Sequence, residues 1–321
     1  MTFLSPDVIA ILMLDGIFSL FGTLALVVSV QIVWRWNPAS ATPLQYRLQK
    51  RSYLVATIVE FLFFLKLPLF LFFIHTLDTL ANVLPGAMCA AGVTTATPYG
   101  MPLFYVKILN LYLFGLWIVL HRLDMARPDM PWTRWKFAFY LLLYPFLLAE
   151  MALEWLHFSH IDPHLIVSCC GTLLSAAKES AVSAFVSLPP TVTLGAFYGL
   201  FAAIVIFGLA KRTLPLALAN LLFVPVAILA LIAFFSPYVY ELPHHHCPFC
   251  LLQADYRYVG YPMYVALFVG TFAGIASWFV RRLGGGNWRR WVAASLAGDG
   301  LFVALVSFYP LFYYLKNGVW L

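Results

Sequence analysis

Charge is what this sequence lacks most: Asp, Glu, Lys and Arg together make up only 10% of its 321 residues, whereas 63% are hydrophobic. A water-soluble domain contains about 25% charged residues, because polar side chains must cover much of its surface. The composition therefore excludes a soluble protein and indicates one that is surrounded by lipid.

Several motifs of well-known sites are also missing. The sequence contains no Walker A lysine loop, no GxGxxG after a strand, no HExxH and no CxxCH. It thus gives no support to a nucleotide-binding, zinc-protease or covalent-haem site. His75 and His157 lie near span ends, but without a second histidine pair we do not expect a haem between the helices.

Long apolar runs recur from one end of the sequence to the other. A run of roughly 20 residues crosses a hydrocarbon core of about 30 Å as a helix. We predict an all-α integral membrane protein, with residues 1–321 forming one polytopic domain of about eight transmembrane helices. The predicted spans are Val8–Val33, Tyr53–Phe73, Pro102–Leu120, Phe137–Leu156, Thr193–Leu209, Pro215–Phe235, Pro262–Val280 and Trp291–Phe312.

The basic residues indicate an orientation. Fourteen Lys and Arg residues lie in the connections after the first, third, fifth and seventh spans, whereas the opposite side has only Lys178, Arg257 and Lys316. Because positive charge is retained in the cytoplasm, both termini are expected on the non-cytoplasmic side of an inner membrane. The net charge of +6 is then explained by the bilayer, and we expect no nucleic-acid partner. Three long loops, at about 76–101, 158–192 and 236–261, would face the periplasm or exterior.

All five cysteines lie in these three predicted outer loops: Cys89 in the first, Cys169 and Cys170 in the second, and Cys247 and Cys250 in the third. An oxidising compartment would permit disulfides between the loops. Since five is an odd number, at least one sulfur must bind a metal, remain a thiol or pair with another chain.

The densest chemical signal is the segment from His244 to Cys250, which reads HHHCPFC. Imidazole beside thiolate is a common ligand set for zinc and copper. We therefore predict a soft-metal site, copper before zinc, through which the protein passes the metal on or senses it, with a periplasmic metal protein as its expected partner. Its ligands are His244, His245, His246, Cys247 and Cys250, with Cys89, Cys169 and Cys170 as secondary donors.

Other functions fit the same cysteines. Disulfides that only tie the loops together would use four of them. Cys247 and Cys250 could instead be the redox pair of a membrane thiol–disulfide oxidoreductase with a periplasmic thiol partner, with Arg257 stabilising a thiolate or a reduced quinone. A CxxC beside membrane spans is similar in layout to the DsbB and vitamin K epoxide reductase families, whose core has four or five helices. A non-catalytic subunit of a larger respiratory or transport complex is a further alternative.

Ionisable residues within the predicted spans need partners, because an isolated charge in hydrocarbon is costly. Glu150, Glu154 and His157 are spaced i, i+4 and i+7, which places them along one stripe of a helix. Lys66 and Lys107 are natural partners for the acidic side chains. We predict an intramembrane polar path consisting of Asp15, Lys66, Lys107, Glu150, Glu154 and His157.

Overall fold

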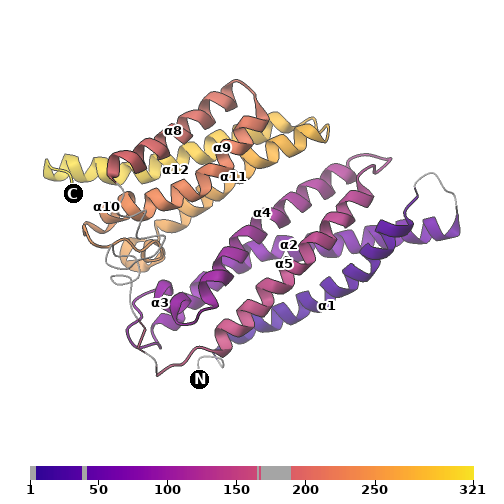
Figure 1. The fold of residues 1–321 in the computed structure, drawn as a ribbon, viewed down its shortest axis with the longest axis horizontal. Coiled ribbons are helices and arrows are strands. Elements are labelled where there is room, and N and C mark those ends of the chain that lie inside the picture. Colours follow the sequence, from indigo (N-terminus) through magenta and orange to yellow (C-terminus); the bar gives the residue numbers. More distant parts are fainter. Residues whose placement is uncertain (1–4, 38–41, 165, 168–188) are drawn as a thin grey trace. The chain divides into compact units, whose positions relative to one another are not determined.

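The computed structural model describes residues 5–37, 42–164, 166–167 and 189–321. This part of the chain is helical and contains no strand. Eight of its helices are long and apolar enough to cross a membrane, as the sequence predicts (Figure 1). The protein is therefore surrounded by a lipid bilayer.

The spanning helices agree with the eight predicted spans and extend a few residues beyond most of them. They are α1 (Pro6–Arg35), α2 (Pro43–Ala81), α4 (Gly100–Met125), α5 (Thr133–Ser159), α8 (Pro190–Leu209), α9 (Thr213–Ala230), α11 (Gly260–Arg282) and α12 (Trp288–Asn317). The sixth span continues from α9 through a π-helical turn, η2 (Leu231–Phe235), into α10 (Ser236–Tyr240). Shorter elements are α3 (Ala90–Thr95), η3 (Cys250–Leu252) and η4 (Ala254–Tyr256).

Local sequence explains where the first two helices begin. The side chains of Ser5 and Thr42 cap α1 and α2 by accepting hydrogen bonds from the backbone N–H groups of Val8 and Gln45. Proline follows each cap, where its missing N–H costs nothing and its fixed φ suits a helix. The N-cap residue and the proline after it therefore determine where each of these two helices begins.

Prolines inside the helices do not end them. Pro68, Pro145 and Pro225 lie within α2, α5 and α9, and Pro310 lies within α12. In a bundle, neighbouring groups compensate for the backbone hydrogen bond that proline removes.

By its contacts the chain divides into two compact units, and a single polytopic domain over residues 1–321 stays a prediction. Unit 1 comprises residues 1–85 and 93–165, and unit 2 comprises residues 86–92 and 166–321. In unit 1, α1 packs on α2 and α5, and α4 packs on the same two helices. In unit 2, α8, α9, α11 and α12 likewise form a ring in which each helix contacts the next.

Each unit has its own core. In unit 1, the rings of Phe63 and Phe114 stack with their centroids 4.1 Å apart, beside Trp117 and Tyr140. In unit 2, α11 and α12 approach closely at two glycines, since a Cβ built on Gly298 would lie 2.6 Å from the Cα of Gly270. Small residues at a helix crossing permit this close packing in membrane proteins.

The predicted outer loops contain regular structure. The first, at 76–101, begins with the last turns of α2 and includes α3. The third, at 236–261, begins with α10 and includes η3 and η4. Most of the second, at 158–192, lies outside the described residues. Their position relative to a membrane remains a prediction from the basic residues.

Candidate metal centre

Three cysteines meet in unit 2. Cys89 comes from the segment before α3, and Cys247 and Cys250 come from the loop between α10 and α11. Their sulfur atoms all lie within 4.8 Å of one another, and all three residues are buried. We call this group the three-cysteine cluster.

Two tyrosines from the flanking helices hold the CxxC loop. The hydroxyl of Tyr240, at the end of α10, donates a hydrogen bond to the backbone carbonyl of Cys247. The hydroxyl of Tyr264, in α11, donates to the carbonyl of Pro248 at 2.7 Å. After Cys250 the chain turns as η3, in which Gln253 N–H donates to the carbonyl of Cys250 at 3.0 Å. The loop is therefore anchored to both helices that it connects.

A side chain joins the two segments that provide the sulfurs. The amide nitrogen of Gln253, three residues after Cys250, donates a hydrogen bond to the carbonyl of Met88 at 2.9 Å. Met88 directly precedes Cys89 in the chain. This bond brings the Cys89 segment beside the CxxC loop.

The separation of the sulfurs fits metal coordination. Sγ of Cys89 and Sγ of Cys247 are 3.6 Å apart, which exceeds the S–S bond length of about 2.05 Å. Two thiolates about 2.3 Å from one tetrahedral zinc ion would be roughly 3.8 Å apart. The cluster can thus hold a metal ion with little rearrangement of Cys89 and Cys247.

The three histidines lie outside this group of sulfurs. His244 is exposed, and His246 Nδ1 forms a 2.9 Å hydrogen bond with the carbonyl of Ile232 in η2. His245 packs edge-on against Tyr240, with ring centroids 4.4 Å apart. Its Nε2 is buried and has no hydrogen-bond partner among the described residues.

The charge state of His245 suits a metal site. Burial lowers the pKa of His245, and the nearby Cys89 opposes this effect. The imidazole is therefore held in its neutral form, which is the form that binds metal ions.

Two other parts of the predicted site remain predictions. Cys169 and Cys170, predicted as secondary donors, lie outside the described residues. Arg257 is exposed and adopts a left-handed backbone conformation, with φ of 55°, after η4. Its predicted role beside a thiolate or quinone therefore remains a prediction.

The predicted polar residues form a network inside unit 1. Lys66 Nζ of α2 donates to Asp15 Oδ1 of α1 at 3.1 Å and to Glu150 Oε1 of α5 at 3.0 Å. Lys107 Nζ of α4 donates to the same oxygen of Glu150 at 3.1 Å and to Glu154 Oε2 at 2.9 Å. All five side chains are buried. We call them the five-residue ion network.

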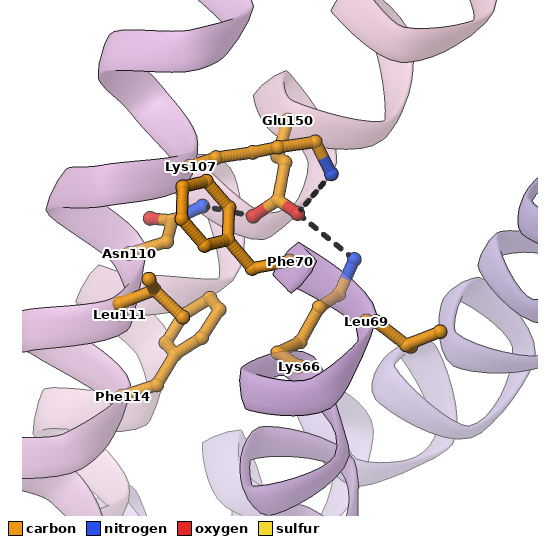
Figure 2. Close-up of a pocket in the computed structure, with 8 residues that line it drawn as sticks. All are labelled: Lys66, Leu69, Phe70, Lys107, Asn110, Leu111, Phe114 and Glu150. Atoms are coloured by element: carbon orange, nitrogen blue, oxygen red, sulfur yellow. Dashed lines mark hydrogen bonds and ion pairs between the residues drawn. The ribbon is translucent and has the colours of Figure 1, made fainter. Parts of the chain in front are cut away.

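Glu150 is the centre of this network (Figure 2). Its other oxygen accepts a 2.6 Å hydrogen bond from the amide of Asn110, so that both of its carboxylate oxygens have donors. A small pocket lined by Lys66, Lys107, Asn110 and Glu150 reaches the network. Its free volume of about 10 Å³ is close to the minimum for one water molecule.

His157 lies further along α5 than Glu154 and is fully buried. Its Nδ1 is 2.7 Å from the hydroxyl of Thr97, whereas its Nε2 has no hydrogen-bond partner among the described residues. The predicted stripe of Glu150, Glu154 and His157 therefore points into unit 1.

Three further polar features were not predicted from the sequence: Asn110, Thr97 and the buried ion pair of Asp124 and Lys136, whose atoms are 2.7 Å apart. Asn110 is three residues after Lys107, a spacing that places both on one face of α4 and could have indicated it. Gln253 has no such signal, because its role depends on a contact with Met88 far away in the sequence.

Comparison with known protein families, curated proteins and solved structures finds no match for this chain. Its function must therefore be argued from its own residues.

Proposed function

We propose that the three-cysteine cluster binds a soft metal ion, copper(I) before zinc, and that this membrane protein passes on or senses that metal. The observation that supports this proposal is the convergence of three buried sulfurs within 4.8 Å. Thiolates select copper(I) and zinc over magnesium or calcium, which prefer oxygen ligands.

The number of sulfur ligands favours copper(I) over zinc. A structural zinc site is almost always tetrahedral and takes four ligands. Among the described residues the cluster supplies three sulfurs, a number that can surround copper(I) without a fourth donor. If zinc binds, we expect His245 as the fourth ligand, because its buried Nε2 has no hydrogen-bond partner in the described part of the chain.

The cellular setting follows from the sequence. The cysteine segments belong to loops predicted to face the periplasm or exterior of an inner membrane, because most basic residues lie in the connections on the other side. A soluble metal carrier on that side would be the natural partner, and transfer to it requires local opening of the loops because the sulfurs are buried. A larger membrane complex remains the alternative setting.

Thiol–disulfide exchange with quinone is less well supported. Exchange proceeds by attack of a thiolate on a disulfide, which requires access to the sulfur. Cys89 and Cys247 are fully buried, and Cys250 is 4% exposed, so a partner protein cannot reach them without local opening. Buried cysteines of this kind are usually unreactive.

Metal loading of the full chain tests the proposal. We expect the protein, purified in mild detergent without oxygen, to bind one copper(I) ion per chain in competition with a chelator. Cys89→Ser, Cys247→Ser and Cys250→Ser should each abolish this binding. His244→Ala is the matched control, since His244 is exposed in the same loop, and it should bind as the parent does.

Two outcomes would overturn the proposal. One is copper(I) binding that Cys89→Ser leaves unchanged. The other is a disulfide between Cys247 and Cys250 that forms and breaks with quinone reduction, detected by mass spectrometry after thiol blocking. Stoichiometric zinc in preference to copper(I) would reverse the order of the two metals.

A further inference from the structure

The five-residue ion network of unit 1 is unbalanced in charge. Within the described part of the chain, three carboxyl groups, those of Asp15, Glu150 and Glu154, face two ammonium groups, those of Lys66 and Lys107. If all five were ionised, the network would carry a net charge of −1. An uncompensated charge buried in a membrane bundle costs several kcal/mol.

A bound proton removes this charge. We propose that Glu154 holds a proton and is the neutral member of the network, so that unit 1 contains a proton-binding site within its helices. This inference is independent of the metal proposed for unit 2. A membrane carboxyl that can bind and release a proton is a typical component of proton relays.

Hydrogen bonding distinguishes Glu150 from the other two acids. Both oxygens of Glu150 accept hydrogen bonds, from Lys66 and Lys107 on one oxygen and from Asn110 on the other. These donors stabilise its ionised form. Asp15 and Glu154 each bond to one lysine through one oxygen, and the second oxygen of each has no partner among the described residues.

Burial then favours Glu154 over Asp15 as the protonated group. The side chain of Glu154 is 1% exposed, whereas that of Asp15 is 9% exposed. The charged form loses more hydration energy where burial is more complete. Among the residues that the structure describes, every charged side chain that bonds to this network belongs to the five already named, which come from α1, α2, α4 and α5.

Two neighbouring features suit proton exchange. The small pocket beside Glu150 has room for about one water molecule, which would connect the network to solvent protons. On the other side, His157 lies three residues after Glu154 on the same helix face, and its Nε2 has no partner within the described residues. A water molecule in this pocket would be a proton source that reaches Glu154 through Glu150. His157 would be a proton acceptor one helical turn further along α5.

Infrared spectroscopy of the full chain at neutral pH tests this proposal directly. A protonated carboxylic acid absorbs in a region where carboxylates do not. We expect a band that shifts when glutamate is labelled with ¹³C at its side-chain carboxyl and that is lost in Glu154→Gln. Asp15→Asn should also abolish the band, because two acids then balance two lysines and Glu154 ionises.

The control is Asp299→Asn, which removes a buried carboxyl of unit 2 and should leave the labelled glutamate band in place. Glu154→Gln is close in shape to the protonated acid and should fold, as circular dichroism can check. If this variant does not fold, Asp15→Asn and the isotope label still decide the question. A protonated-carboxyl band that does not shift when glutamate is labelled would assign the proton to Asp15. The absence of any protonated glutamate band would show that Glu154 is ionised. Either result overturns the proposal.

Discussion

The sulfur atoms of Cys89 and Cys247 lie 3.6 Å apart, although 158 residues separate them in the sequence. The two segments that carry them meet in unit 2, where Gln253 bonds to the backbone of Met88. This convergence gives the cluster its third sulfur, because a CxxC alone provides only two.

Loss of the bond between Gln253 and Met88 should weaken metal binding without removing a ligand. In Gln253→Ala we expect the affinity for copper(I) to fall by about tenfold, as is typical when a group that positions a metal ligand is removed. A chelator competition measures this change. Asp255→Ala is the control, because Asp255 is exposed in the same loop, and an equal loss there would contradict the role of the Gln253 bond.

Lys66 should be important for the stability of unit 1. In Lys66→Met the carboxylate of Asp15 loses the cation with which it is paired in the described part of the chain, and breaking a buried pair in this way costs about 3–5 kcal/mol of unfolding free energy. Denaturant unfolding in detergent measures the loss. Adding Asp15→Asn to Lys66→Met should recover part of it, since no charged carboxylate is then left without its lysine.

An exposed ion pair provides the comparison for Lys66. Lys316 and Glu241 are 3.0 Å apart, but their side chains are 52% and 50% exposed. Lys316→Met should therefore cost less than about 1 kcal/mol. If Lys316→Met lost as much unfolding free energy as Lys66→Met, burial would not determine the cost of breaking an ion pair.

The crossing of α11 and α12 should not tolerate a methyl group at Gly298. A Cβ there would lie 2.6 Å from the Cα of Gly270, so Gly298→Ala must push the helices apart and should destabilise unit 2 by about 1–3 kcal/mol. Gly300→Ala, two residues along the same helix, meets nothing within 4 Å and should be neutral or slightly stabilising. Thermal unfolding of the two variants makes the comparison.

The orientation predicted from the basic residues can be measured by thiol labelling. In a background with all five cysteines changed to serine, Asp129→Cys and His164→Cys would each place one thiol at an exposed position. We expect a membrane-impermeant maleimide to label His164→Cys in intact cells and Asp129→Cys only after permeabilisation. The reverse pattern would place the termini in the cytoplasm.

The fold could be predicted in outline because hydropathy is a local property. Each run of apolar residues is long enough to span a membrane by itself, so all eight spanning helices were found. The π-helical turn Leu231–Phe235 was not predicted, and neither was the division into two units. Both depend on how helices pack, which the apolar pattern of a single helix does not specify.

The candidate site was predicted only in part. The sequence drew attention to Cys247 and Cys250 because two cysteines and three histidines stand together, and it ranked the histidines above Cys89. The structure instead places Cys89 in the cluster and turns His246 toward the carbonyl of Ile232. Neighbouring positions in a chain do not guarantee that side chains converge, whereas folding can bring distant ones together.

The sequence by itself determined that this protein lies in a membrane, since its residues could not cover a soluble fold with polar surface. It also determined that Lys66, Lys107 and the acidic residues of α5 must find partners, because lipid cannot stabilise their charges. Only the tertiary structure decided which atoms pair, with Glu150 between both lysines, and which cysteines meet. The physical reason is that hydrophobicity acts on each segment separately, whereas hydrogen bonds and metal coordination require atoms from several segments at defined distances.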